Sequence, residues 1–117
     1  LAALVRRTAA QLDPVLGPQG AELFQALVAR LGPLVPGLRV GVRKGYVTLG
    51  TAVQFAVAVP GRDAPGIRLG LVAQAPGPAL PPAPPMGGSD RFRLLLDVPD
   101  AAAIEAAVAH LRVAATG

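Results

Sequence analysis

The hydrophobic pattern changes its period part-way along the chain, and this change limits the available folds. Over Gln19–Leu31, apolar residues recur at the spacing of a helix with one buried stripe. Over Leu38–Val42, apolar residues alternate with polar or small ones, which is the spacing of a strand with one buried face. The two patterns within 117 residues predict one α+β domain, spanning residues 1–117.

Alternation returns in Tyr46–Leu49, Val53–Val59, Ile67–Leu71 and Arg91–Val98. The first four strands follow one another through short turns, and parallel pairing would need long crossovers. We therefore expect a mostly meander, antiparallel sheet of about five strands. The expected inward residues include Phe55, Val57 and Val59, and also Phe92.

Two main helices are predicted, at Gln19–Leu31 and after Pro99, with Asp100 as the N-cap of the second. Residues 1–18 are expected to form a short helix followed by a turn at Asp13-Pro14 and Gly17-Pro18. The predicted order is (α)αββββ-βα. Each main helix has a single apolar stripe, so we expect both on one face of the sheet.

Residues 75–88 contain six prolines and no hydrophobic periodicity, which predicts a long loop with polyproline character. Pro78–Pro81 matches PxxP, a pattern that is common by chance. Because Leu1 is not a natural start, we expect the chain to be trimmed or a fragment. There is no export signal or membrane-length apolar run, which predicts a cytoplasmic protein.

The chain carries eleven Lys and Arg against seven Asp and Glu, a net charge of +4. This excess is typical of proteins that bind nucleic acid or another polyanion. Nearly all of these cations are arginine in a chain rich in Ala, Gly and Pro, so the alternative explanation is GC-rich codon usage. The absence of cysteine excludes disulfides and thiolate metal sites.

The sheet face opposite the predicted helices is expected to combine arginines with small residues and almost no acid. Small side chains let a ligand approach the backbone, and arginine offers donors that match carboxylate or phosphate. The alternatives are an ordinary solvated face or, through its Ala/Gly strip, a dimer contact. The expected face comprises Arg39, Gly41, Arg43, Gln54, Ala56, Ala58, Arg68, Gly70, Arg91 and Arg93. The candidate ligand-binding residues are Arg39, Arg43, Lys44, Tyr46, Gln54, Arg68, Arg91 and Arg93.

No catalytic, metal or cofactor motif accompanies this face. The single histidine, His110, lies on the last predicted helix without a nucleophile beside it, so a packed or surface role is expected. The acids are scattered, which predicts neither a metal site nor a carboxylate pair. With Phe55 and Phe92 expected inward, only Tyr46 remains to stack on a base.

Several short blocks, Lys44–Thr48, Gln54–Ala56, Ile67–Leu71 and Arg91–Leu94, follow one another in an order that resembles a small bacterial domain-of-unknown-function family, number fifty-six fifty-five. The resemblance spans about residues 22–114 and implies a compact α+β module without an assigned activity. Two departures are Asp90, where relatives often have histidine, and Ala114-Ala115, where they often have Ala-Tyr.

These observations predict a non-enzymatic binding or accessory domain that engages an anionic ligand, nucleic acid or a protein partner through the arginine-bearing face. A structural homodimer module is the alternative, and an enzyme of unknown reaction is the third candidate. No cofactor and no membrane partner are expected.

Overall fold

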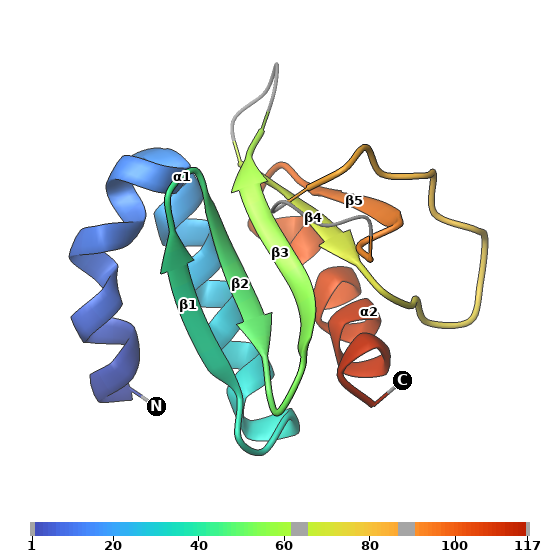
Figure 1. The fold of residues 1–117 in the computed structure, drawn as a ribbon, viewed down its shortest axis with the longest axis horizontal. Helices are drawn as coiled ribbons and strands as arrows, with labels where there is room; N and C mark the ends of the chain where they lie inside the picture. The colour runs from blue at the N-terminus through green and yellow to red at the C-terminus, as the bar shows by residue number, and fades with distance from the viewer. Residues whose placement is uncertain (1, 62–65, 87–90, 117) are drawn as a thin grey trace.

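The structure is a computed structural model that describes residues 2–61, 66–86 and 91–116, with side chains from Leu12 onward. One kinked helix precedes five strands, and a second helix follows them (Figure 1). The elements are α1 (Ala2–Leu31), a 3-10 turn η1 (Gly32–Leu34), β1 (Arg39–Arg43), β2 (Tyr46–Gly50), β3 (Gln54–Pro60), β4 (Ile67–Leu71), β5 (Leu94–Val98), a 3-10 turn η2 (Ala101–Ala103) and α2 (Ile104–Thr116).

The five strands form one sheet in the order β1-β2-β3-β4-β5, and every neighbouring pair is antiparallel. The predicted α+β fold with a five-stranded meander is therefore confirmed. Asp100 also has its predicted role, because its carboxylate accepts a hydrogen bond of 3.1 Å from the amide of Ala102 at the start of the C-terminal helical segment.

The turn predicted at Asp13-Pro14 is wrong, because α1 continues through these residues and leaves helical geometry only at Gly17 (φ 79°, ψ 162°). Glycine adopts this left-handed conformation without the steric penalty of a Cβ, and Pro18 is well suited to the first turn of the helical segment that follows. Figure 1 shows the two segments of α1 running side by side. Leu12 and Leu16, before the kink, are buried, and this burial offsets the hydrogen bond lost at Pro14.

Both helices lie on the same face of the sheet, as predicted (Figure 1). The side chains of α1 and α2 enter one core with the inner face of the strands. Its largest fully buried members include Phe24, Leu27, Leu69 and Leu111. An ion pair between Arg30 of α1 and Glu105 of α2 links the helices on the outside.

The predicted orientation of β3 is confirmed for Phe55, which belongs to the main core, but is wrong from Ala56 onward. Ala56 and Ala58 face the helices, whereas Val57 faces away from them. The reason is a bulge between β2 and β3: Leu49 pairs with Ala56, but Gly50 pairs with Gln54, so Phe55 is an extra residue. A shift of one residue exchanges the two faces of a strand. The small alanines then lie beneath the helices, where larger side chains would hold the two layers apart.

A second, smaller cluster lies on the sheet face opposite the helices. It consists of Val57, Met86 and Phe92, all buried. A Cβ on Gly70 would lie 3.0 Å from Met86 Sδ and 3.0 Å from Phe92 Cβ, so the covering side chains sit directly on the strand. The prediction that Phe92 faces the helices is therefore wrong.

Phe92 can join this second cluster because β5 begins at Leu94 and not at Arg91, so Phe92 lies before the strand. The carbonyl of Arg93 accepts a hydrogen bond of 2.8 Å from Ala83, and the amide of Leu95 donates one of 2.9 Å to Pro81. The proline-rich segment, Leu80–Met86, thus lies along the start of β5. The expected bare face is consequently covered over part of β3–β5, Thr48 of β2 is buried on the same face, and exposed arginines remain along β1.

Candidate binding surface

The uncovered part of the sheet carries three cations, Arg39, Arg43 and Lys44, together with Tyr46. We call these four residues the hairpin face. Arg39 and Arg43 point away from the helices because the intervening Val40 and Val42 pack against the main core. Arg43 is paired directly with Tyr46 at the end of the hairpin. Lys44 occupies the turn with Gly45, whose φ of 89° favours glycine.

The cations of the hairpin face are exposed, and Tyr46 is half-buried. Arg39 and Arg43 are four residues apart on one strand, so their Cα atoms are separated by roughly 13 Å. Between them, Gly41 lies beside Thr48, whose hydroxyl donates a hydrogen bond of 3.3 Å to the Gly41 carbonyl. A Cβ at position 41 would lie 2.6 Å from that hydroxyl oxygen. Glycine therefore leaves the sheet surface between Arg39 and Arg43 without a protruding side chain.

Arg68 is on the same side of the sheet but has a local partner. It is paired across β4 and β5 with Asp97, and its Nε donates to the Asp97 carboxylate at 3.0 Å. The Arg68 side chain is 25% exposed. Its charge is therefore compensated within the fold, although the face was expected to carry almost no acid.

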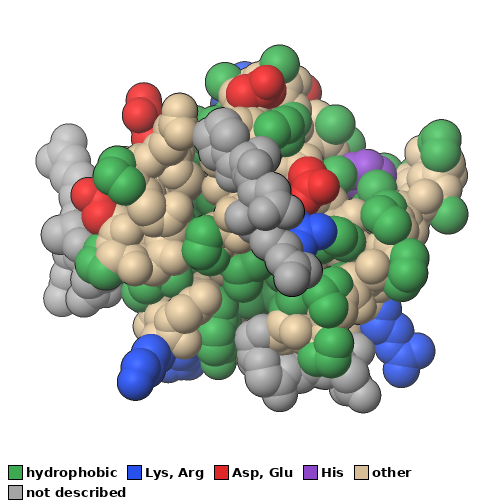
Figure 2. Space-filling view, turned by 90° about the horizontal axis from the view of Figure 1, so that it is seen from above, with side chains coloured by type: hydrophobic (Ala, Val, Ile, Leu, Met, Phe, Trp, Pro, Cys, Tyr) green, Lys and Arg blue, Asp and Glu red, His purple; other side chains and the backbone are tan. Residues whose placement is uncertain are grey.

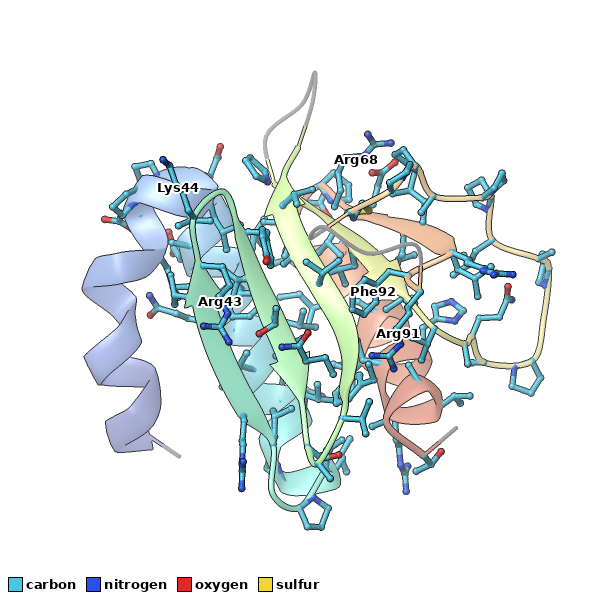
Figure 3. The ribbon with its side chains drawn as sticks, in the orientation of Figure 1. Arg43, Lys44, Arg68, Arg91 and Phe92 are labelled. Atoms are coloured by element: carbon cyan, nitrogen blue, oxygen red, sulfur yellow. The ribbon has the colours of Figure 1, made fainter. Side chains whose placement is uncertain are left out.

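Arg91 and Gln54, which are far apart in the sequence, are in contact at the start of β3. An Arg91 Nη donates to the Gln54 carbonyl at 3.2 Å, and the guanidinium carbon lies 5.9 Å from the centre of the Phe92 ring. Figure 3 shows Arg91 and Phe92 on one side of β3 and Arg43 on the other. The arginines of the sequence prediction therefore do not form one cluster.

A groove of about 670 Å³ adjoins Arg91. Its walls come from the β2–β3 turn, the start of β3, the residues directly after β4, the segment before β5 and the C-terminal end of α2. The lining residues are Thr51, Ala52, Val53, Gln54, Phe55, Val72, Ala73, Arg91, Ala114, Ala115 and Thr116. Sequence reasoning identified only Gln54 and Arg91, because no local pattern reports that these separate segments meet.

Arg93, the last of the eight predicted residues, is exposed on the segment that precedes β5. Its carbonyl accepts a hydrogen bond from Ala83, so its backbone lies beside the proline-rich segment and away from the hairpin face. Figure 2 shows the same dispersion, because Lys and Arg side chains appear at several separate places in that view. The eight predicted residues thus fall into the hairpin face, the Arg91–Gln54 contact, and two separate arginines.

His110 connects α2 to the loop after β4. Its Nδ1 accepts a hydrogen bond of 3.0 Å from the amide of Ala75. The adjacent Gln74 holds the same loop, since its amide nitrogen donates to the Pro78 carbonyl at 2.9 Å and its oxygen accepts from Leu80 at 2.8 Å. The predicted packing role of His110 is consistent with this contact.

Replacing His110 with alanine is expected to lower the free energy of unfolding by about 1–2 kcal/mol, because the part-buried amide of Ala75 loses its acceptor. Asparagine places its side-chain oxygen close to the position of Nδ1, so His110→Asn should recover part of the loss. Urea denaturation of both variants measures the difference. Equal stability of the two variants would show that the hydrogen bond contributes nothing.

Among the residues that the structure describes, no three His, Asp or Glu side chains gather where they could hold a metal ion. Within the same residues, no helix is both long and apolar enough to span a membrane. No family model, curated protein or solved structure matches the chain. The resemblance to the bacterial family named above therefore stays a prediction.

Proposed function

We propose that this chain is a non-enzymatic binding domain that engages an acidic segment of a partner protein through the hairpin face. The observation that supports this most directly is the exposure of three cations, Arg39 and Arg43 on β1 and Lys44 in the turn that follows. None of the five described acids forms an ion pair with these cations: Asp97 pairs with Arg68, Glu105 pairs with Arg30, and the helical layer carries Asp13, Glu22 and Asp100. Such a surface attracts carboxylates with little competition from its own side chains.

An acidic protein segment fits this surface better than nucleic acid does. Proteins that bind single strands combine a continuous basic groove with several aromatic stacking platforms. Here the cations are separated, Phe55 and Phe92 are buried, and Tyr46 is the one partly accessible aromatic side chain on the hairpin face. An extended carboxylate-bearing peptide lying across β1 needs only a few separated cations.

The dimer alternative loses the surface on which it was based. Ala56 and Ala58 are fully buried beneath the helices, and Gly70 is covered by Met86 and Phe92. Of the expected Ala/Gly strip, only Gly41 lies on the uncovered part of the sheet. We therefore do not propose self-association through that strip.

Fluorescence anisotropy with a labelled oligo-glutamate peptide tests the proposed function. The protein is expected to bind the peptide at about 50 mM salt and to bind it more weakly at about 200 mM, because exposed charges are screened. Arg43→Glu should weaken binding by about tenfold, equivalent to roughly 1.4 kcal/mol. The matched control is Arg112→Glu, which makes the same charge change at an exposed position on α2.

Equal effects of Arg43→Glu and Arg112→Glu would mean that only net charge matters and would contradict the assignment of the hairpin face. A labelled single-stranded DNA measured in parallel is expected to bind more weakly than the peptide. Tighter binding to DNA, with a steep salt dependence, would replace the acidic segment by nucleic acid as the partner.

A further inference from the structure

The segment from Leu80 to Met86 shows a burial pattern with a period of three. Leu80 and Ala83 are half-buried and Met86 is buried, whereas the four prolines between them are exposed. Leu80 packs against the main core, and Ala83 and Met86 pack against the second cluster. A polyproline II helix has three residues per turn, so one edge of this segment contacts the domain and two edges face outward.

Covalent constraints favour this conformation. Each proline has φ fixed near −65°, and each residue that precedes a proline is driven toward extended ψ values. Pro81 and Pro84 satisfy both conditions, since each is followed by another proline. Pro82 forms an isolated antiparallel bridge with Leu94, which is consistent with an extended backbone.

The domain holds the inner edge of the segment in place. The Pro81 carbonyl accepts a hydrogen bond of 2.9 Å from Leu95, and the Ala83 amide donates one of 2.8 Å to Arg93. At the start of the segment, the amide of Leu80 donates to the Gln74 side chain at 2.8 Å. These bonds leave the proline rings exposed, and the segment is already ordered before any partner binds.

We propose that the outer edges of Leu80–Met86 are a preorganised polyproline II ligand for a partner domain with an aromatic-lined groove. Such grooves accept prolines spaced three residues apart, and Pro81 with Pro84 and Pro82 with Pro85 provide two such ridges. The partner binds a segment whose ordering entropy has been lost during folding, which lowers the cost of association. This inference is independent of the hairpin face.

Arg93 specifies the charge of that partner. Its backbone is bonded to Ala83, in the middle of the segment, and its side chain is exposed. An exposed cation whose backbone adjoins the segment is best matched by a carboxylate at the rim of the aromatic groove. The partner that fits is therefore an aromatic groove with an acidic rim.

Nuclear magnetic resonance titration of the intact ¹⁵N-labelled protein with a panel of purified SH3 and WW domains tests the inference. At least one domain should bind, with shift changes at the amides of Ala83 and Met86 and at the aromatic side chains of its groove. Of the double variants Pro81→Ala/Pro84→Ala and Pro82→Ala/Pro85→Ala, at least one should weaken binding by about tenfold. The matched control, Pro76→Ala/Pro78→Ala, removes two exposed prolines outside the segment and should change affinity by less than about twofold.

A synthetic peptide of residues 78–86 provides the comparison for preorganisation. The folded protein is expected to bind the same panel domain more tightly than the peptide does. Binding by the peptide without binding by the folded protein would show that the ridges are inaccessible, which overturns the inference. Failure of every panel domain to bind the folded protein, or an equal loss in the control variant, would also overturn it.

Discussion

Replacing Gly66 with alanine is expected to lower the free energy of unfolding by roughly 3–5 kcal/mol, the combined effect of backbone strain and overpacking. Gly66 has a φ of 103°, a conformation that L side chains rarely adopt. An added Cβ would also collide with the backbone, because it would overlap the Val98 carbonyl oxygen and lie 2.7 Å from Pro99 Cα. Backbone atoms at the end of β5 cannot rotate away as a flexible side chain can.

The position of Gly66 explains why the effect should extend through the domain. Its carbonyl accepts a hydrogen bond of 3.1 Å from Gly61, and it lies close to Gly20 of α1. The start of β4, the end of β5 and helix α1 therefore meet at this residue. A displacement there should disturb the helical layer and the sheet together.

Gly45→Ala is the matched control for the conformational part of this effect. Gly45 has a similar φ of 89°, but an added Cβ would meet no atom within 4 Å. Its substitution is expected to cost only about 1–2 kcal/mol of strain. Urea denaturation of both variants measures the difference, and equal destabilisation would show that the collision at Gly66 is relieved without cost.

Phe92→Ala is expected to lower the free energy of unfolding by about 3–4 kcal/mol, as is usual for a buried aromatic residue. Phe92 is 3% exposed and packs with Val57 and Met86. It covers Gly70, which has no side chain of its own to protect the strand. The loss of the ring should release the proline-rich segment as well as leave a cavity.

Hydrogen exchange distinguishes this release from general destabilisation. The amides of Ala83 and Leu95, which join the proline-rich segment to the start of β5, should lose protection in Phe92→Ala more than the amides that join β2 to β3. Phe92→Leu is the control, because it retains most of the apolar volume and should cost less than about 1.5 kcal/mol. Uniform loss of protection across the sheet would contradict a specific role in holding the segment.

The two errors about the faces of the sheet share one physical origin. The alternation in Gln54–Pro60 is real, but both of its faces are apolar or small, so the pattern alone leaves its orientation open. The β2–β3 bulge at Phe55 sets the orientation, and a bulge depends on how two strands pair. Likewise, Phe92 lies on the far face because Arg93 bonds to a loop residue and not to β4.

The candidate site was predicted in part for the same reason. Arg39 and Arg43 were assigned to the correct face because a single strand with clear alternation determines their direction. The pairing of Arg68 with Asp97 and the contact of Arg91 with Gln54 each join residues about 30 or more positions apart, as the sequence numbers show. No local pattern contains that information.

The amino-acid sequence alone determined the α+β class, the antiparallel meander, the helical cap at Asp100 and the direction of the β1 arginines, because each follows from local periodicity, short connections or backbone chemistry. Only the tertiary structure decided which face of β3 meets the helices, which cations remain uncompensated, and that the prolines of Leu80–Met86 are held outward. These features depend on strand register and on contacts between distant segments. Those interactions form only when the chain folds.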